Sequence, residues 1–257
     1  MTLTNIKSKP LKWSTGNAKL SKRIIHFSLP SGHTCPAAHL CLSKADMTKG
    51  TITDGKYTEY RCYAASQEAA YPALRNIRWD NFLELKNLSR RKMFHRLKGS
   101  LSPAHQQYML DHGQRPIIRA HVGGDFFNER YFLAWMDLAH EYHPTQFYAY
   151  TKRLDLWVKH KQIIPDNFEL NASRGGKHDK LIDLHNLKCA TVVYSHEQAA
   201  HLNLELDHDD SHAYKPTGSF AQLIHGTQPK GSSASKAISK LRTKYGCVGH
   251  KASTKTV

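Results

Sequence analysis

Three cysteines lie close together in the first quarter of the chain. Cys35 and Cys41 are six positions apart, and Cys62 follows a polar stretch that contains glycine. Thiolates are soft ligands that suit zinc or iron–sulfur clusters. The first residues lack the apolar core of a signal peptide, so we expect a cytoplasmic protein whose cysteines stay reduced. The pattern predicts a metal-binding loop over residues 33–62.

Two kinds of metal centre fit these cysteines. A structural zinc site takes four protein ligands, and the further candidates are His33, His39, Cys189 and Cys247. A [4Fe–4S] cluster held by three cysteines leaves one iron free to bind a substrate or cofactor. The remaining interpretation is that the cysteines are small buried residues that bind no metal. Cys189 lies in an apolar run and is expected in the core.

The densest group of polar ligand-type side chains is DHDDSH at residues 207–212. Carboxylates and imidazoles together bind Mn, Zn or Fe, or act as acid–base groups. Because alternate residues of an extended segment share a face, His208, Asp210 and His212 could converge. The other interpretation is a polar loop whose side chains satisfy backbone groups in turns.

Three shorter motifs each follow an apolar run. Glycines at 123–124 would let the backbone approach a ligand closely, and the carboxylate after them could receive an ammonium. A lysine at 152 could bind phosphate or carboxylate. A serine and an arginine before the glycines at 175–176 could bind an anion. The candidate binding residues are Gly123, Gly124, Asp125, Ser173 and Arg174, and the candidate reactive residue is Lys152.

Apolar runs and helical patterns alternate along the chain and would position these motifs. The expected strands are residues 23–29, 116–122, 146–150, 167–172, 189–194 and 219–225. The expected helices are residues 66–97, 128–142, 154–161, 179–186, 196–203 and 232–243. Such alternation predicts an α/β fold of six repeated βα units with parallel strands. The sheet could be doubly wound or a partial barrel, and in both the functional loops follow the strands.

The remaining segments and the composition complete the predicted organisation. Residues 1–22 are expected to be a flexible basic arm, 23–245 a single βα-repeat domain and 246–257 a basic tail. Residues 204–216 suggest a short extra strand and a loop. Phe126, Phe127, Phe147 and Tyr148 are expected in the core. No apolar run is long enough for a membrane span.

The formal charge of the 257-residue chain is +16, from 37 lysines and arginines against 21 aspartates and glutamates. Such a charge attracts polyanions, of which nucleic acid is the commonest in a cell, although a solvated basic surface has the same composition. Nucleic acid or a nucleotide is therefore the expected partner. We expect no association with a membrane.

Several motifs together carry a family resemblance. They are Cys35, Cys41, CYA at residues 62–64, VGGDFF at 122–127, YTKR at 150–153 and HDDSHA at 208–213. Over nearly its whole length the chain resembles the phage and bacterial "gene 88 protein" family. More distantly, it is similar to proteins associated with the radical S-adenosylmethionine (radical SAM) enzymes.

The second resemblance implies a fold, cofactors and roles. Radical SAM enzymes typically form a partial (open) TIM-type barrel of six βα units, with a [4Fe–4S] cluster on three cysteines after the first strand. A Gly-Gly-Glu segment after the second strand meets the amino group of S-adenosylmethionine, where this chain has an aspartate. The resemblance makes Cys35, Cys41 and Cys62 the cluster ligands. It makes Gly123, Gly124 and Asp125 the cofactor-binding residues, with Ser173 and Arg174 assisting. Substrate-orienting roles fall to Lys152, His208, Asp210 and His212.

Two rival functions belong to other classes. One is a divalent-metal-dependent nuclease or hydrolase that uses the cluster at residues 207–212 and carries a structural zinc. It predicts activity with added metal and no reductant. The other is a non-catalytic nucleic-acid-binding phage accessory protein, which predicts salt-sensitive binding without turnover.

Overall fold

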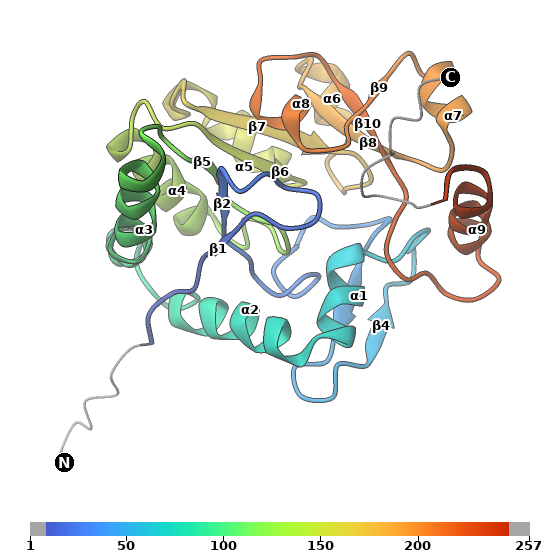
Figure 1. Ribbon diagram of the computed structural model, residues 1–257, viewed down its shortest axis with the longest axis horizontal. Helices are drawn as coiled ribbons and strands as arrows, with labels where there is room; N and C mark the ends of the chain where they lie inside the picture. Colours follow the sequence, from blue (N-terminus) through green and yellow to red (C-terminus); the bar gives the residue numbers. More distant parts are fainter. Residues whose placement is uncertain (1–8, 247–257) are drawn as a thin grey trace.

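An eight-stranded, mostly parallel β-sheet forms the centre of the computed structural model, which describes residues 9–246 (Figure 1). The strands, in their order across the sheet, are β1 (Ser14–Thr15), β2 (Ile24–His26), β5 (Ile117–Arg119), β6 (Phe147–Thr151), β7 (Phe168–Ser173), β8 (Cys189–Val193), β10 (Phe220–Leu223) and β9 (Glu205–Leu206). Within this sheet, β1 and β2 pair antiparallel and all the other neighbouring strands pair parallel. The fold is therefore a mixed α/β fold.

All six predicted strands are present, as β2, β5, β6, β7, β8 and β10. They are neighbours in the order in which the chain visits them, whereas a doubly wound sheet reverses its order part-way. β1 and β9 occupy the two edges, and the sheet does not close. A TIM-type barrel is thus not shown. The predicted extra strand in residues 204–216 corresponds to β9.

Five helices that follow strands agree with the prediction. They are α4 (Glu129–Glu141), α5 (Leu154–Lys159), α6 (Lys180–Leu184), α7 (His196–His201) and α9 (Ser233–Tyr245). Side-chain oxygens that accept backbone N–H groups begin three of them: Asn128 caps α4, Ser195 caps α7 and Ser232 caps α9. A 3₁₀ turn, η1 (Lys161–Ile163), follows α5.

The connection between the first two predicted strands is longer and more divided than the single helix expected over residues 66–97. It contains α1 (Tyr63–Ala70), α2 (Pro72–Leu85) and α3 (Arg90–His112). Pro72 starts a new helix because it has no N–H to continue α1. Ser89 caps α3, which ends at Gly113 with a φ of +63°. A hairpin that the sequence did not indicate, β3 (Ser43–Ala45) and β4 (Ile52–Asp54), lies inside the cysteine loop.

The described part of the predicted N-terminal arm packs on the domain. Leu11 and Leu20 are buried, and the Lys12 N–H donates to Asn81 Oδ1 at 2.8 Å. Residues 1–8 and most of the predicted tail, with Cys247, lie outside the described residues.

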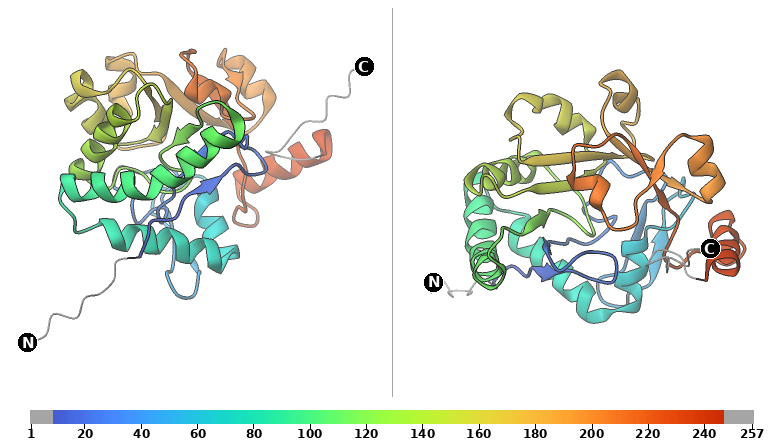
Figure 2. Two further views of the ribbon diagram at one scale, coloured as in Figure 1. Left: turned by 60° about the vertical axis from the view of Figure 1, so that its left-hand side comes forward. Right: turned by 45° about the horizontal axis from the view of Figure 1, so that its top comes forward.

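The largest core cluster combines aliphatic and aromatic side chains and includes residues of the sheet, α3 and α4. Trp135 on α4 contacts Phe27 and Phe147 edge-on, with ring centroids 6.0 and 6.5 Å apart. Phe126, Phe147 and Tyr148 are fully buried, as expected for core residues. No helix among residues 9–246 could span a membrane. Figures 1 and 2 show α9 set apart at the edge of the molecule, across from α3.

Candidate functional site

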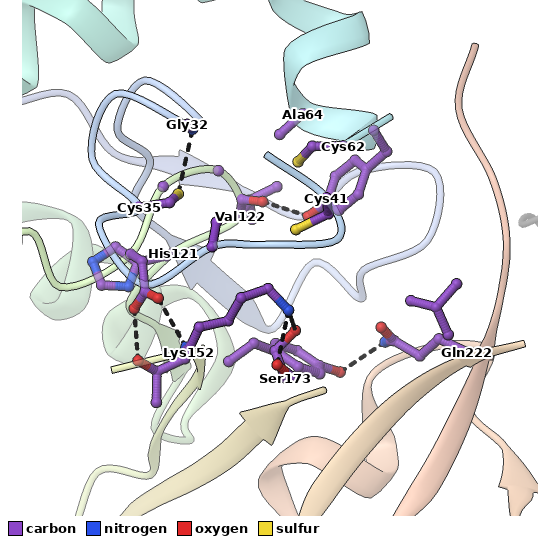
Figure 3. Close-up of a pocket in the computed structure, with 18 of the residues that line it drawn as sticks. Gly32, Cys35, Cys41, Cys62, Ala64, His121, Val122, Lys152, Ser173 and Gln222 are labelled. Carbon is purple, nitrogen blue, oxygen red and sulfur yellow. Dashed lines mark hydrogen bonds between the residues drawn. The ribbon is translucent and has the colours of Figure 1, made fainter. Parts of the chain in front are cut away.

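A pocket lies where the parallel strands end, as the strand–loop rule predicts. Its empty volume is about 930 Å³, including the part open to solvent. The predicted residues that line it are Cys35, Cys41, Cys62, Gly123, Gly124, Asp125, Lys152 and Ser173. The cysteines come from the long connection after β2, and the other residues lie at or just beyond the ends of β5, β6 and β7. Figure 3 shows most of these side chains around the pocket.

The cysteine loop is attached to the loop after β7. The Gly175 carbonyl accepts the N–H groups of His39 and Leu40, at 3.3 and 3.0 Å. The Asp179 carboxylate accepts the N–H groups of Gly175 and Gly176, at 2.7 and 2.8 Å. Asp179 therefore already occupies the backbone N–H groups of Gly175 and Gly176, and this turn holds the cysteine loop in place.

The three cysteines project into the pocket from the same side, opposite Lys152 and Ser173 (Figure 3). Burial raises the pKa of Cys35 well above its usual value, and the nearby Asp125 carboxylate adds to the effect. Burial and the neighbouring Cys41 raise the pKa of Cys62 to about 12. The thiols of Cys35 and Cys62 are therefore protonated at neutral pH, and binding a metal would release these protons.

The geometry bears on which metal would suit this pocket. Among residues 9–246, no group of three or more Cys, His, Asp and Glu side chains is arranged to hold a single ion. The three cysteines nevertheless share one pocket. The structure therefore brings the three thiols to one pocket without forming a ready-made site for a single ion.

The further zinc ligands considered from the sequence are occupied elsewhere or face away. His33 Nε2 bonds the Ala45 carbonyl at 3.0 Å. Neither His33 nor His39 lines the pocket. Cys189 is buried in β8, also outside the pocket, with its sulfur 3.9 Å from Arg174 Nη2.

Asp125 is buried and joins the ends of β5 and β6. Its Oδ1 accepts from Thr151 Oγ1 at 2.6 Å and from the Phe126 N–H at 2.7 Å, and its Oδ2 accepts from the Lys152 N–H at 2.8 Å. A carboxylate has about four acceptor sites, so one remains for a ligand. Burial outweighs these bonds and raises the pKa of Asp125.

The two glycines before Asp125 have a packing reason beyond close approach of a ligand. Gly124 has a φ of +90°, and a Cβ there would lie 2.6 Å from Thr34 Oγ1. A Cβ at Gly123 would lie 2.8 Å from the guanidinium carbon of Arg78. Side chains are excluded at both positions, so the backbone itself lines the pocket.

Lys152 is a buried cation held by neutral oxygens. Its Nζ donates to the Ser173 carbonyl at 2.8 Å, to Ser173 Oγ at 2.9 Å and to the Arg174 carbonyl at 2.8 Å. No carboxylate of the described chain forms an ion pair with it. The Arg174 side chain lies outside the pocket and pairs with Asp183 at 3.2 Å. Of the two predicted anion-binding residues, only Ser173 lines the pocket.

No residue of 207–212 lines the pocket, although Asp210 pairs with the lining residue Arg119, and the segment does not bring His208, Asp210 and His212 together. Asp210 is buried, pairs with Arg119 and Lys19, and accepts from Tyr148 OH at 2.9 Å. Burial opposes ionisation, but Arg119 and Lys19 outweigh it and lower the pKa of Asp210 to about 2.

The two histidines of this segment face elsewhere. His208 is exposed, whereas His212 lies 2.8 Å from a Glu205 oxygen and 3.3 Å from an Asp207 oxygen. The segment is not extended, because Asp210 has a φ of +66° and precedes the short helix α8 (Ser211–Tyr214). The face-sharing expected from alternation therefore does not arise.

The sequence as a whole matches one known protein family. The model of the family described as Gene product 88 matches residues 5–244. The chain belongs to the gene product 88 family. No curated protein and no solved structure matches it, so no comparison supports the more distant resemblance to radical SAM enzymes.

The pocket of this gene product 88 protein also contains polar residues that the sequence analysis did not select. Arg119 and His121 line it from the end of β5, and Tyr150 and Gln222 line the side across from the cysteines. The Arg119 guanidinium lies 4.9 Å from the centroid of the Tyr150 ring, and Gln222 Nε2 donates to Tyr150 OH at 3.0 Å. Arg119 and His121 occupy alternate positions in the apolar run PIIRAHV, and that alternation was the available signal.

Proposed function

We propose that this gene product 88 protein is an iron–sulfur enzyme of the radical SAM type that acts on nucleic acid or a nucleotide. One observation carries the proposal: Cys35, Cys41 and Cys62 line one pocket with residues 123–125, which are distant from them in the sequence. The order of the six parallel strands supports it, because successive neighbours are the arrangement of a partial barrel. The proposal includes such a partial barrel.

In this proposal the thiolates of Cys35, Cys41 and Cys62 hold a [4Fe–4S] cluster, and S-adenosylmethionine binds beside it. Together they would supply a carbon radical, chemistry that belongs to the cofactors. The acceptor site left on Asp125 receives the amino group of S-adenosylmethionine. The Lys152 ammonium, which lacks a carboxylate partner among the described residues, attracts an anionic group of a ligand. Because Gly123 and Gly124 have no side chains, they leave room for the ligand between Asp125 and Lys152.

Reductive cleavage of S-adenosylmethionine tests this function. Anaerobically reconstituted protein with a strong one-electron reductant is expected to release methionine. The variant Cys35→Ala should release none. Cys189→Ala is the matched control, because Cys189 lies outside the pocket, and it should behave as the wild type. Wild-type protein that carries iron and sulfide but leaves S-adenosylmethionine intact would contradict the proposal.

A further inference from the structure

Helix α9 forms the outer layer of one wall of the pocket. Its buried residues Ala234, Ile238 and Leu241 belong to a cluster that also contains Tyr60 and Val192. Tyr60 and Val192 line the pocket. The buried face of α9 therefore packs directly behind residues that line the pocket.

The outward face of α9 is basic. Lys236, Lys240 and Arg242 are exposed and form no ion pair with the described residues, and Lys244 alone pairs, with Glu197 at 2.8 Å. The helix contains no acidic residue. Lys236 and Lys240 are four residues apart, so they lie on the same face and repel each other. Such charges favour a polyanion, whose phosphates would relieve the repulsion.

An exposed aromatic side chain lies in the cysteine loop, three residues before Tyr60. Tyr57 is 56% exposed, and its ring centroid lies 4.7 Å from that of His39. Lys56 Nζ lies 5.3 Å from the ring centroid of Tyr57. Tyr57 is thus linked to α9 through Tyr60, which packs with the buried face of the helix. Basic side chains combined with an exposed aromatic ring are how many proteins bind single-stranded nucleic acids, with phosphates on the cations and a base on the ring.

We infer that α9 and Tyr57 bind a single-stranded nucleic acid, one nucleotide of which enters the pocket. This inference rests on the proposed function for the role of the pocket, but the binding surface is independent of the cofactor. A single strand is preferred to a duplex because a paired base cannot reach groups at the bottom of a pocket. Stacking on Tyr57 also requires an unpaired base.

Fluorescence anisotropy with labelled oligonucleotides tests the inference, using single-stranded DNA, single-stranded RNA and a duplex of the same sequence. Lys236→Gln with Lys240→Gln should weaken single-strand binding roughly 20-fold at 0.1 M salt. It should also reduce the slope of log K against log salt by about 1.4, because each phosphate contact on a single strand contributes about 0.7. Tyr57→Ala should weaken binding by about 5- to 150-fold, the range for loss of one stacked base.

The matched control removes the same charge elsewhere. Arg91 and Lys92 are exposed on α3, across the molecule from α9 (Figure 2). Arg91→Gln with Lys92→Gln should change the affinity by less than about twofold, because surface charges beyond a Debye length are screened. Equal losses in the two double variants would show charge attraction without a site and overturn the inference, as would tighter binding of the duplex.

Iron content and methionine release are measured on the same preparations. Loss of binding in the α9 variant with wild-type iron content supports the inference alone. Selective binding by a wild type that holds no iron would contradict the proposed function but leave the binding surface standing. Wild-type protein that holds iron but binds single strands and the duplex equally well would contradict the binding surface and leave the proposed function standing.

Discussion

Replacing Asp210 with asparagine tests whether the polar segment at residues 207–212 supports the fold or performs chemistry. The Asp210 carboxylate is fully buried between Arg119 and Lys19 and also accepts from Tyr148. Asparagine keeps the shape but removes the negative charge. The side chains of Arg119 and Lys19 would then face a neutral amide, and the Arg119 guanidinium is buried.

Removing one partner of a buried ion pair costs about 3–5 kcal/mol. We therefore expect Asp210→Asn to lower the free energy of unfolding at pH 7 by about that amount, measured by urea denaturation followed by circular dichroism. Asp209→Asn is the control, because Asp209 is exposed and adjacent. Its expected change is within about 0.5 kcal/mol.

The pH dependence provides a second part of the test. The pKa of Asp210 is about 2 in the folded protein, below about 3.9 in an unfolded chain. Its contribution to stability is present above pH 4 and is lost as the pH falls through 2. The difference between wild type and variant should therefore shrink below pH 4. An Asp210→Asn protein as stable as wild type at pH 7 would refute this reasoning and make Asp210 a candidate for chemistry again.

Two further predictions concern buried groups near the pocket. Burial lowers the pKa of His26 to about 4 and of His121 to about 3, so both are neutral in the folded protein. Their contribution is present above pH 6.5 and is lost as the pH falls through the folded values, because the unfolded chain binds the extra protons. The urea concentration at the midpoint of unfolding should therefore decrease as the pH is lowered from 7 to 5, and it should decrease less in His121→Gln. The same decrease in the variant as in the wild type would contradict this prediction. Gly124→Ala should destabilise the fold by about 1–3 kcal/mol in thermal or urea unfolding, since the residue has a φ of +90° and no space for a Cβ. Gly218→Ala, where a Cβ meets nothing within 4 Å, is its control, and equal effects would count against the explanation.

The strands and the meeting of the loops were predictable from sequence because each depends on a local rule. Runs such as CATVVY at residues 189–194 combine apolar and β-branched residues, and they form strands here. Once the strands are parallel, their carboxyl ends share one edge. The cysteines, Gly123, Gly124 and Asp125 therefore meet in one pocket, although they are far apart in the chain.

The parts that could not be predicted depend on tertiary contacts. The left-handed backbone of Asp210 is compensated by ion pairs with Arg119 and Lys19, which come from distant segments. Periodicity alone gave an extended segment there. The hairpin in the cysteine loop has strands of three residues each, too short for an alternating pattern to indicate.

Iron, sulfide and zinc analysis of anaerobically purified protein tests whether the three cysteines hold an iron–sulfur cluster. We expect about four irons and four sulfides per chain. Both should be lost in Cys35→Ala and retained in Cys189→Ala. One zinc without sulfide, or an iron content that Cys35→Ala leaves unchanged, would contradict the iron–sulfur centre at Cys35, Cys41 and Cys62.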